Sequence, residues 1–215
     1  MSFHVAWNST RGDLLVVIGG YRLDSLYDIL GRVGVDRGAV KALFVSFKMG
    51  ALRSYEQPVP LDAVFPNVDE LHVFMDGHKS FGGEFLERRD GSWKVLTLEL
   101  PYSGHQIPRI GGRARAQHLY LTRSRGPKLA WNDRLQKLAD ASDRVIVLTK
   151  LVADVPSSFK ISVQIPEGRS GKRDAMRVNP DWPYNKHEML VPITFARVPD
   201  LPDDLLRRVA WLIAQ

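Results

Sequence analysis

Short apolar segments, the first of them rich in β-branched residues, recur along this chain, in places at a spacing of roughly 25 residues. Glycine, proline or charged residues bound most of them, as expected for buried strands that end in turns. The segments are GDLLVVIGG (12–20), VKALFVSF (40–47), NVDELHVFM (67–75), HLYLT (118–122), DRVIVLTKLV (143–152), FKISVQI (159–165) and MLVPITFARV (189–198). A chain built this way is expected to form a sheet with a buried interior.

Helical patterns alternate with several of these strands. After the first strand, Leu23, Leu26, Ile29 and Leu30 recur at helical intervals. Further helices are predicted in VPLDAVF (59–65), LAWNDRLQKLADA (129–141) and LPDDLLRRVAWLIAQ (201–215), the last with Pro202 and Asp203 in its first turn. The alternation predicts a single α/β domain over residues 1–215, with a mostly parallel central sheet flanked by helices.

The segment EFLERRDGSWKVLTLEL (84–100) carries a different signal. Two runs with strand character flank Asp90 and Gly91, a dipeptide that suits a tight turn because it readily adopts positive φ. We therefore predict a β-hairpin inserted after the third strand. The spacing of the strands also suits a leucine-rich-repeat solenoid, which stays open as an alternative although the sequences between the strands do not match one another.

Composition narrows the class of protein. The chain has 215 residues, of which 44% are apolar and 25% charged, as in an ordinary globular protein. Its N-terminus lacks a signal-peptide pattern and no apolar run is long enough to span a bilayer, so we expect a cytoplasmic protein without a membrane partner. Since there is no cysteine, disulfides, thiolate metal sites and cysteine nucleophiles are excluded. Nucleotide, dinucleotide and zinc-protease signatures are missing too, so no cofactor or metal is expected.

Positive charge is concentrated in one part of the chain. The net charge is +6, and no acidic residue occurs between Glu99 and Asp133. The basic residues there are Arg109, Arg113, Arg115, Arg123, Arg125 and Lys128. Arginine suits phosphates and carboxylates, so the segment predicts an anionic partner, either nucleic acid or an acidic protein. A solvated segment paired with acidic patches elsewhere is the alternative. Residues 166–188, rich in Pro, Gly and charge, are predicted to form a flexible basic loop.

His78 is the candidate for acid–base chemistry. It follows the predicted third strand directly, and Gly77 before it allows the backbone to turn. An imidazole at the carboxyl end of a strand can act as a general base, with Asp76 as its orienting partner. A histidine that merely ends a strand and has no chemical role is the alternative.

The run MDGHKSF, the strand HLYLT followed by RSRG, and the helix end LADASDRVIVLTK together resemble the caspase-like clan, particularly its CHAT branch, over residues 12–150. In that family a histidine follows the third strand in a Gly-His context, and a nucleophilic cysteine ends the fourth. The resemblance implies His78 as the base and Ser124 at the nucleophile position, or Thr122 in another alignment. A serine hydroxyl needs strong assistance from a base and an oxyanion site, so cysteine-peptidase activity is not expected.

Two functions follow from these observations. The first is a catalytically degenerate caspase-like domain that binds an acidic protein or nucleic acid through a basic loop. The second is a nucleic-acid-binding or nuclease-like protein that uses the segment from Arg109 to Lys128. Steep weakening of binding by salt would mark the second, because contacts to phosphates release counterions.

Overall fold

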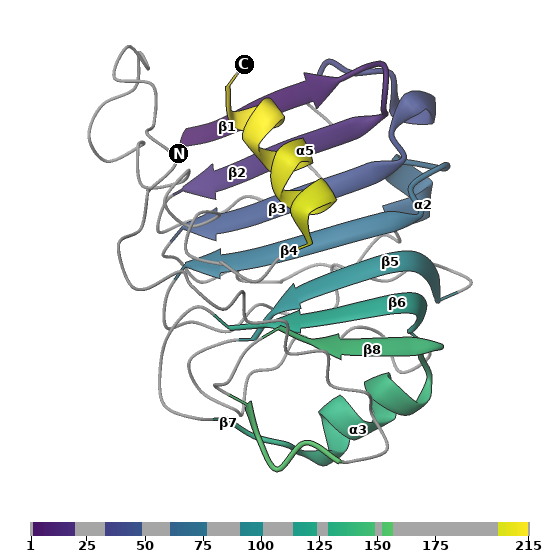
Figure 1. Ribbon diagram of the computed structural model, residues 1–215. Coiled ribbons are helices and arrows are strands. Elements are labelled where there is room, and N and C mark those ends of the chain that lie inside the picture. The colour runs from purple at the N-terminus through teal and green to yellow at the C-terminus, as the bar shows by residue number, and fades with distance from the viewer. Residues whose placement is uncertain are drawn as a thin grey trace.

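The computed structural model describes residues 2–19, 33–48, 61–76, 91–100, 114–123, 129–148, 152–156 and 202–214 (Figure 1). Seven strands form one central sheet in the order β1-β2-β3-β4-β5-β6-β8. The pair β1–β2 is antiparallel, and every other neighbouring pair is parallel. The prediction of an α/β protein with a mostly parallel sheet is therefore confirmed.

The strands of the central sheet are β1 (Ser2–Asn8), β2 (Asp13–Gly19), β3 (Ala42–Lys48), β4 (Glu70–Asp76), β5 (Ser92–Glu99), β6 (Arg115–Thr122) and β8 (Arg144–Val147). Two short strands, β7 (Leu129–Ala130) and β9 (Val152–Ala153), form a separate parallel pair. The helices are α2 (Leu61–Val64), α3 (Asp133–Asp140) and α5 (Asp203–Ile213), with a 3-10 turn η1 (Arg37–Ala39).

Local signals explain where the helices begin. Asn132 caps α3, since its side-chain oxygen accepts hydrogen bonds from the backbone N–H groups of Arg134 and Leu135 at 3.1 Å each. The helix predicted from residue 129 therefore starts four residues later, and the first two residues of the prediction form β7. Helix α5 begins after Pro202, as predicted, with two aspartates in its first turn. The helix predicted around residues 23–30, the last two predicted strands and the loop 166–188 lie outside the described residues.

Strand β1 was not predicted. It pairs with the whole of β2 through a tight turn in which the N–H of Gly12 donates to the backbone oxygen of Asn8 at 2.8 Å. Gly12 has a φ of +76°, and a Cβ there would lie 2.5 Å from the backbone oxygen of Ala39, so only glycine fits. The alternation of Phe3, Val5 and Trp7 was the available sequence signal.

Strand β5 is a central strand of the sheet. It pairs in parallel with β4 on one side and with β6 on the other. This strand was expected to be the second arm of a hairpin whose first arm, residues 84–89, lies outside the described part of the chain. The hairpin therefore stays a prediction. Both strands that pair with its second arm in the structure run parallel to it.

The order of the parallel strands in the sheet follows their order in the chain. The connection from β3 to β4 contains α2, and the connection from β6 to β8 contains α3; both helices pack on the same face of the sheet. This is expected because parallel crossovers are right-handed, so strands added in one direction keep their connections on one face. Doubly wound sheets bind ligands where the strand order reverses. The described sheet has no such reversal, and its sequential order is the one that a solenoid would give.

The two faces of the sheet bury different cores. The first face packs against α2 and α3, and its central leucines are Leu43, Leu71, Leu96 and Leu119. The second face packs against α5 through Leu205, Val209 and Leu212. Figure 1 shows α5 crossing β1 to β4, with β5, β6 and β8 beside it. Among the helices described, none is long and apolar enough to cross a membrane.

Candidate functional site

The proposed acid–base site lies at the carboxyl end of β4. Asp76 is the last residue of this strand, so the strand does run directly into the Gly-His pair. Residues 77–90 and 124–128 lie outside the described residues, and these ranges include His78 and Ser124. The combination of Asp76, His78 and Ser124 therefore stays a prediction.

Polar side chains are buried at the same edge of the sheet. Glu99 and Thr122 are directly paired at the ends of β5 and β6, and Arg123 follows. Glu99 is 2% exposed and Arg123 is 4% exposed. Burying a charge is costly unless it is paired, and both side chains do have interaction partners. The carboxyl ends of β5 and β6 thus have a polar interior, in contrast to the apolar middle of the sheet.

The basic residues predicted to act together are not all on one surface. Arg115 is the first residue of β6 and is exposed, whereas Arg123 follows the last residue of β6 and is buried. Eight residues of extended strand separate them by about 26 Å. Arg109, Arg113, Arg125 and Lys128 lie outside the described residues. Two of the six predicted binding residues are thus at opposite ends of one strand.

A buried charge network joins α5 to the amino ends of β2 and β4. Arg208 of α5 donates two hydrogen bonds to Asp13, from Nη2 to Oδ1 at 2.7 Å and from Nε to Oδ2 at 3.1 Å. Its other terminal nitrogen, Nη1, donates to Oε2 of Glu70 at 2.8 Å. The guanidinium also lies over the ring of Phe44, 5.2 Å from its centroid. One arginine therefore ties the C-terminal helix to two strands across β3.

His72 extends this network beneath the helix. Its Nδ1 lies 2.9 Å from the hydroxyl of Thr97, and its Nε2 lies 3.7 Å from Oε2 of Glu70. The ring stacks on Phe44 with centroids 4.4 Å apart. Complete burial lowers the pKa of His72, against the opposing effect of Glu70. Burial alone would raise the pKa of Glu70, but contacts with His72 and Arg208 outweigh it and lower this pKa to about 2.

These pKa shifts predict that acid destabilises the fold. His72 stays neutral in the folded protein, while in the unfolded chain it takes up a proton near its ordinary pKa of 6.5. Stability should therefore be full above pH 6.5 and fall below it, by at most about 1.4 kcal/mol per pH unit from this group. Glu70 should add a second loss as pH falls from 4.5 toward 2, because its carboxylate is stabilised only in the fold. Urea unfolding at several pH values measures both.

Replacement of His72 by glutamine is the control for this pH dependence. The variant should lose the fall in stability that begins below pH 6.5 and keep part of the loss at lower pH, because Arg208 still contacts Glu70. A wild-type unfolding free energy that stays constant or rises on going from pH 7 to pH 5 would contradict the assignment.

A second polar region lies on the second face, beside α5. In β5, Trp93 and Leu96 are both buried in the first-face core, so the two residues between them, Lys94 and Val95, both turn away from it. The Lys94 ammonium lies 3.5 Å from Oε1 of Glu70, which places it on the side of α5. The strand thus departs from strict alternation and adds a cation to the second face.

Strand β6 shows the same irregularity beside it. Ala116 and Leu119 are buried in the first-face core, and Gln117 and His118 between them point the other way. Arg115 alternates with Gln117 and is exposed. Since the two strands pair in register over this stretch, the departures lie side by side.

Tyr120 and Arg144 complete this region. Tyr120 is half-buried against the second-face core. Arg144 is exposed and lies two residues before Ile146, a member of that core, so it faces the same side. We call the region the open basic surface. Its members are Lys94, Arg115, Gln117, His118, Tyr120 and Arg144.

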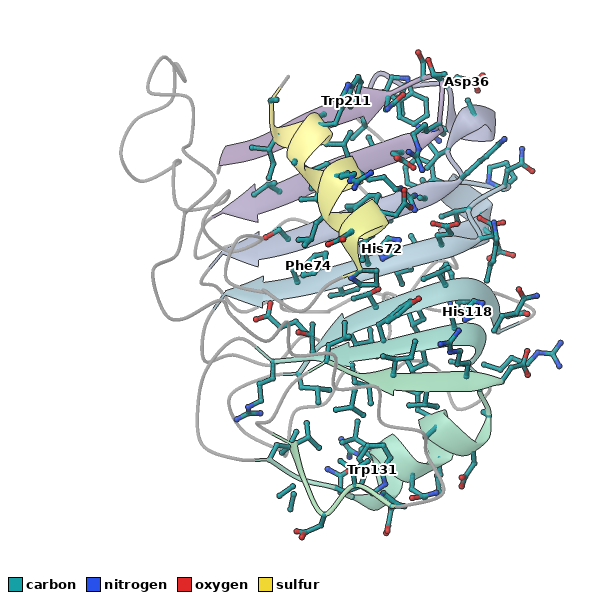
Figure 2. All side chains as sticks on the ribbon, viewed as in Figure 1. Asp36, His72, Phe74, His118, Trp131 and Trp211 are labelled. Atoms are coloured by element: carbon teal, nitrogen blue, oxygen red, sulfur yellow. The ribbon has the colours of Figure 1, made fainter. Side chains whose placement is uncertain are left out.

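The open basic surface could not be identified from the sequence. Glu70, Val95, His118 and Arg144 are level with one another across four strands. Lys94 and Arg144 are 50 positions apart in the sequence and meet only through this register. The alternation of His118 and Tyr120 in a predicted strand was the one available signal. Figure 2 shows His118 near the amino ends of β5 and β6, away from α5.

Neither a metal site nor a match to a known protein identifies the function of this chain. Within the described residues, no group of three or more His, Asp or Glu side chains is placed to hold a metal ion. Comparison of the chain with protein-family models, curated proteins and solved structures finds no match. Its function must therefore be inferred from its own residues.

Proposed function

We propose that this chain is a binding domain that holds an anionic partner on the open basic surface. The observation that carries the proposal is the convergence of three exposed cations, Lys94, Arg115 and Arg144, from three neighbouring strands. Strands in a sheet are about 4.8 Å apart, so the backbones of the two outer strands are about 10 Å apart. Along β6, Arg115 lies three residues, about 10 Å, before His118, which is level with Arg144. The three cations therefore occupy a patch about 10 Å in each direction and create a local positive potential that attracts a polyanion.

The nearby acidic side chains do not cancel the positive charge of this surface. The Glu70 carboxylate is held by Arg208 at 2.8 Å, and Lys94 approaches its second oxygen at 3.5 Å. The Lys94 side chain remains 56% exposed, so its ammonium is accessible to a ligand. Asp143 is exposed beside Arg144. Among the described residues, the three exposed cations therefore outnumber the exposed carboxylates next to them.

The caspase-like organisation with a degenerate centre remains part of the proposal. It is supported by β4 ending immediately before Gly77 and His78, by the missing cysteine, and by the buried polar residues Glu99 and Arg123 at the same edge. An experimental structure tests it. His78 and Ser124 should come within hydrogen-bond reach of each other, and a separation well beyond about 3.5 Å would remove the caspase-like centre from the proposal.

Removing the three cations should abolish most of the binding. In the triple variant Lys94→Ala, Arg115→Ala, Arg144→Ala, affinity for inorganic polyphosphate should fall at least tenfold at low salt. The slope of log K against log salt should also decrease by about one for each phosphate that the variant no longer neutralises. Fluorescence anisotropy with a labelled polyphosphate, over a series of salt concentrations, measures both quantities.

A matched variant separates the surface from the net charge. Arg134→Ala, Lys137→Ala, Arg207→Ala also removes three exposed cations, but from α3 and α5. It should bind almost as the unchanged protein does. Equal losses in the two triple variants would mean that overall charge alone drives binding, and the proposed surface would be rejected.

A further inference from the structure

We infer that the anionic partner is a single-stranded nucleic acid, whose bases stack on Tyr120 while its phosphates pair with Lys94, Arg115 and Arg144 on the adjoining part of the surface. The inference rests on the proposed function and names the partner of the same surface. Stacking on Tyr120 distinguishes a nucleic acid from an acidic protein, because only a nucleic acid carries a flat aromatic base next to each charged phosphate.

His118 lies among the cations of this surface, level with Arg144, and Tyr120 lies two residues beyond them along β6, level with Thr97 and Ile146. Along β6, Arg115 is followed on the same side by His118 and Tyr120, with Lys94 on one neighbouring strand and Arg144 on the other. His118 and Tyr120 are two residues apart, which is about 6.6 Å along a strand. A sheet face with ring side chains flanked by basic residues is a common platform for unpaired bases, since their π faces are exposed.

The width of the open basic surface fits a short stretch of single-stranded nucleic acid. The three cation-bearing strands span about 10 Å, so the surface can contact only a short stretch of a nucleic-acid chain. In a duplex the base faces are covered by their neighbours and proteins reach only base edges in the grooves. A half-buried tyrosine on a sheet face does not project far enough to reach those edges, so an unpaired strand is the better match.

The imidazole of His118 lowers the stability of the fold at this position, which suggests that it is kept for binding. Its Nδ1 is buried and has no hydrogen-bond partner in the described structure. A buried polar atom without a partner destabilises a fold, and an apolar residue of similar size would avoid that loss. Retaining an imidazole next to Tyr120 is consistent with a second flat ring for a neighbouring base.

Two substitutions of Tyr120 test the stacking directly. Tyr120→Phe keeps the ring, whereas Tyr120→Leu keeps an apolar side chain of moderate size and removes the ring. Binding of a labelled single-stranded oligothymidine should weaken about 5- to 150-fold in the leucine variant. The phenylalanine variant should bind nearly as the unchanged protein does. Inorganic polyphosphate, which has charge but no bases, should bind both variants equally well.

The controls separate this inference from the proposed function. Circular dichroism and thermal unfolding of Tyr120→Leu establish that it is folded, and His118→Leu offers a second variant that removes a ring. If neither ring variant weakens oligothymidine binding, or if a duplex of the same length binds more tightly than the single strand, the inference of a stacked single strand is wrong. The proposal of polyanion binding would still stand. If neither polyphosphate nor oligothymidine binds at low salt, the proposed function itself fails.

Discussion

Replacement of Arg208 by methionine should lower the free energy of unfolding by about 3 to 5 kcal/mol. Arg208 is the common partner of Asp13, which is 2% exposed, and of Glu70. Burial alone would lower the pKa of Arg208, but hydrogen bonds and charges from these two carboxylates outweigh it and raise that pKa. Without the guanidinium both carboxylates would lose their closest charged partner in a poorly solvated site, leaving Asp13 with Arg11 at 3.6 Å and Glu70 with Lys94 at 3.5 Å. Urea unfolding monitored by circular dichroism measures the change.

The neighbouring residue gives a matched control. Arg207 lies on the same helix and is exposed, so Arg207→Met should change stability by no more than about 0.5 kcal/mol. Combining Arg208→Met with Asp13→Asn and Glu70→Gln should recover part of the loss, because much of it comes from carboxylates that have lost their closest charged partner. Equal effects of the two methionine substitutions would show that α5 is not fastened by Arg208.

Replacement of Phe44 by alanine should destabilise the fold by a similar amount, about 3 to 5 kcal/mol. Phe44 is fully buried at the centre of the second-face core. Its ring stacks on His72 and lies beneath the Arg208 guanidinium, so the substitution leaves a cavity and removes both of these ring interactions. The midpoint of chemical unfolding should shift strongly without a change in the sheet's circular dichroism at low denaturant.

A second pair of variants isolates the contribution of the ring interactions. Phe44→Leu and Phe65→Leu both remove a fully buried phenylalanine, but Phe65 belongs to the first-face core. The loss at Phe44 should exceed that at Phe65 by about 0.5 to 2 kcal/mol, the contribution of stacking and cation–π attraction. Equal losses would indicate that Phe44 contributes only its apolar volume.

Stability and proposed binding depend on different parts of the second face. Helix α5 crosses β1 to β4, where Arg208 and Phe44 fasten it, and leaves the face of β5, β6 and β8 for the open basic surface. Lys94 is the link between the two regions, because it contacts Glu70 and is itself exposed. Changes at Arg208 are therefore expected to act mainly on folding, and changes at Arg115 or Arg144 mainly on binding.

Local sequence was sufficient to predict most of the described elements. Strands β2, β3, β4, β6 and β8 each contain a short apolar run, and α5 has proline and aspartate in its first turn. These features act over a few neighbouring residues, so they can be read without knowing the fold. The resemblance to caspase-like proteins stays a prediction, because His78 and Ser124 lie outside the described residues.

Tertiary structure alone decided which residues meet. The sequence by itself determined that strands would form and that positive charge would collect between Glu99 and Asp133. It did not determine that Arg115 and Arg123 lie at opposite ends of β6, or that Lys94 and Arg144 share one surface. Strand register is set by packing between residues far apart in the chain, and a shift by one residue moves every side chain to the other face. The candidate site therefore depends on long-range pairing that no local pattern specifies.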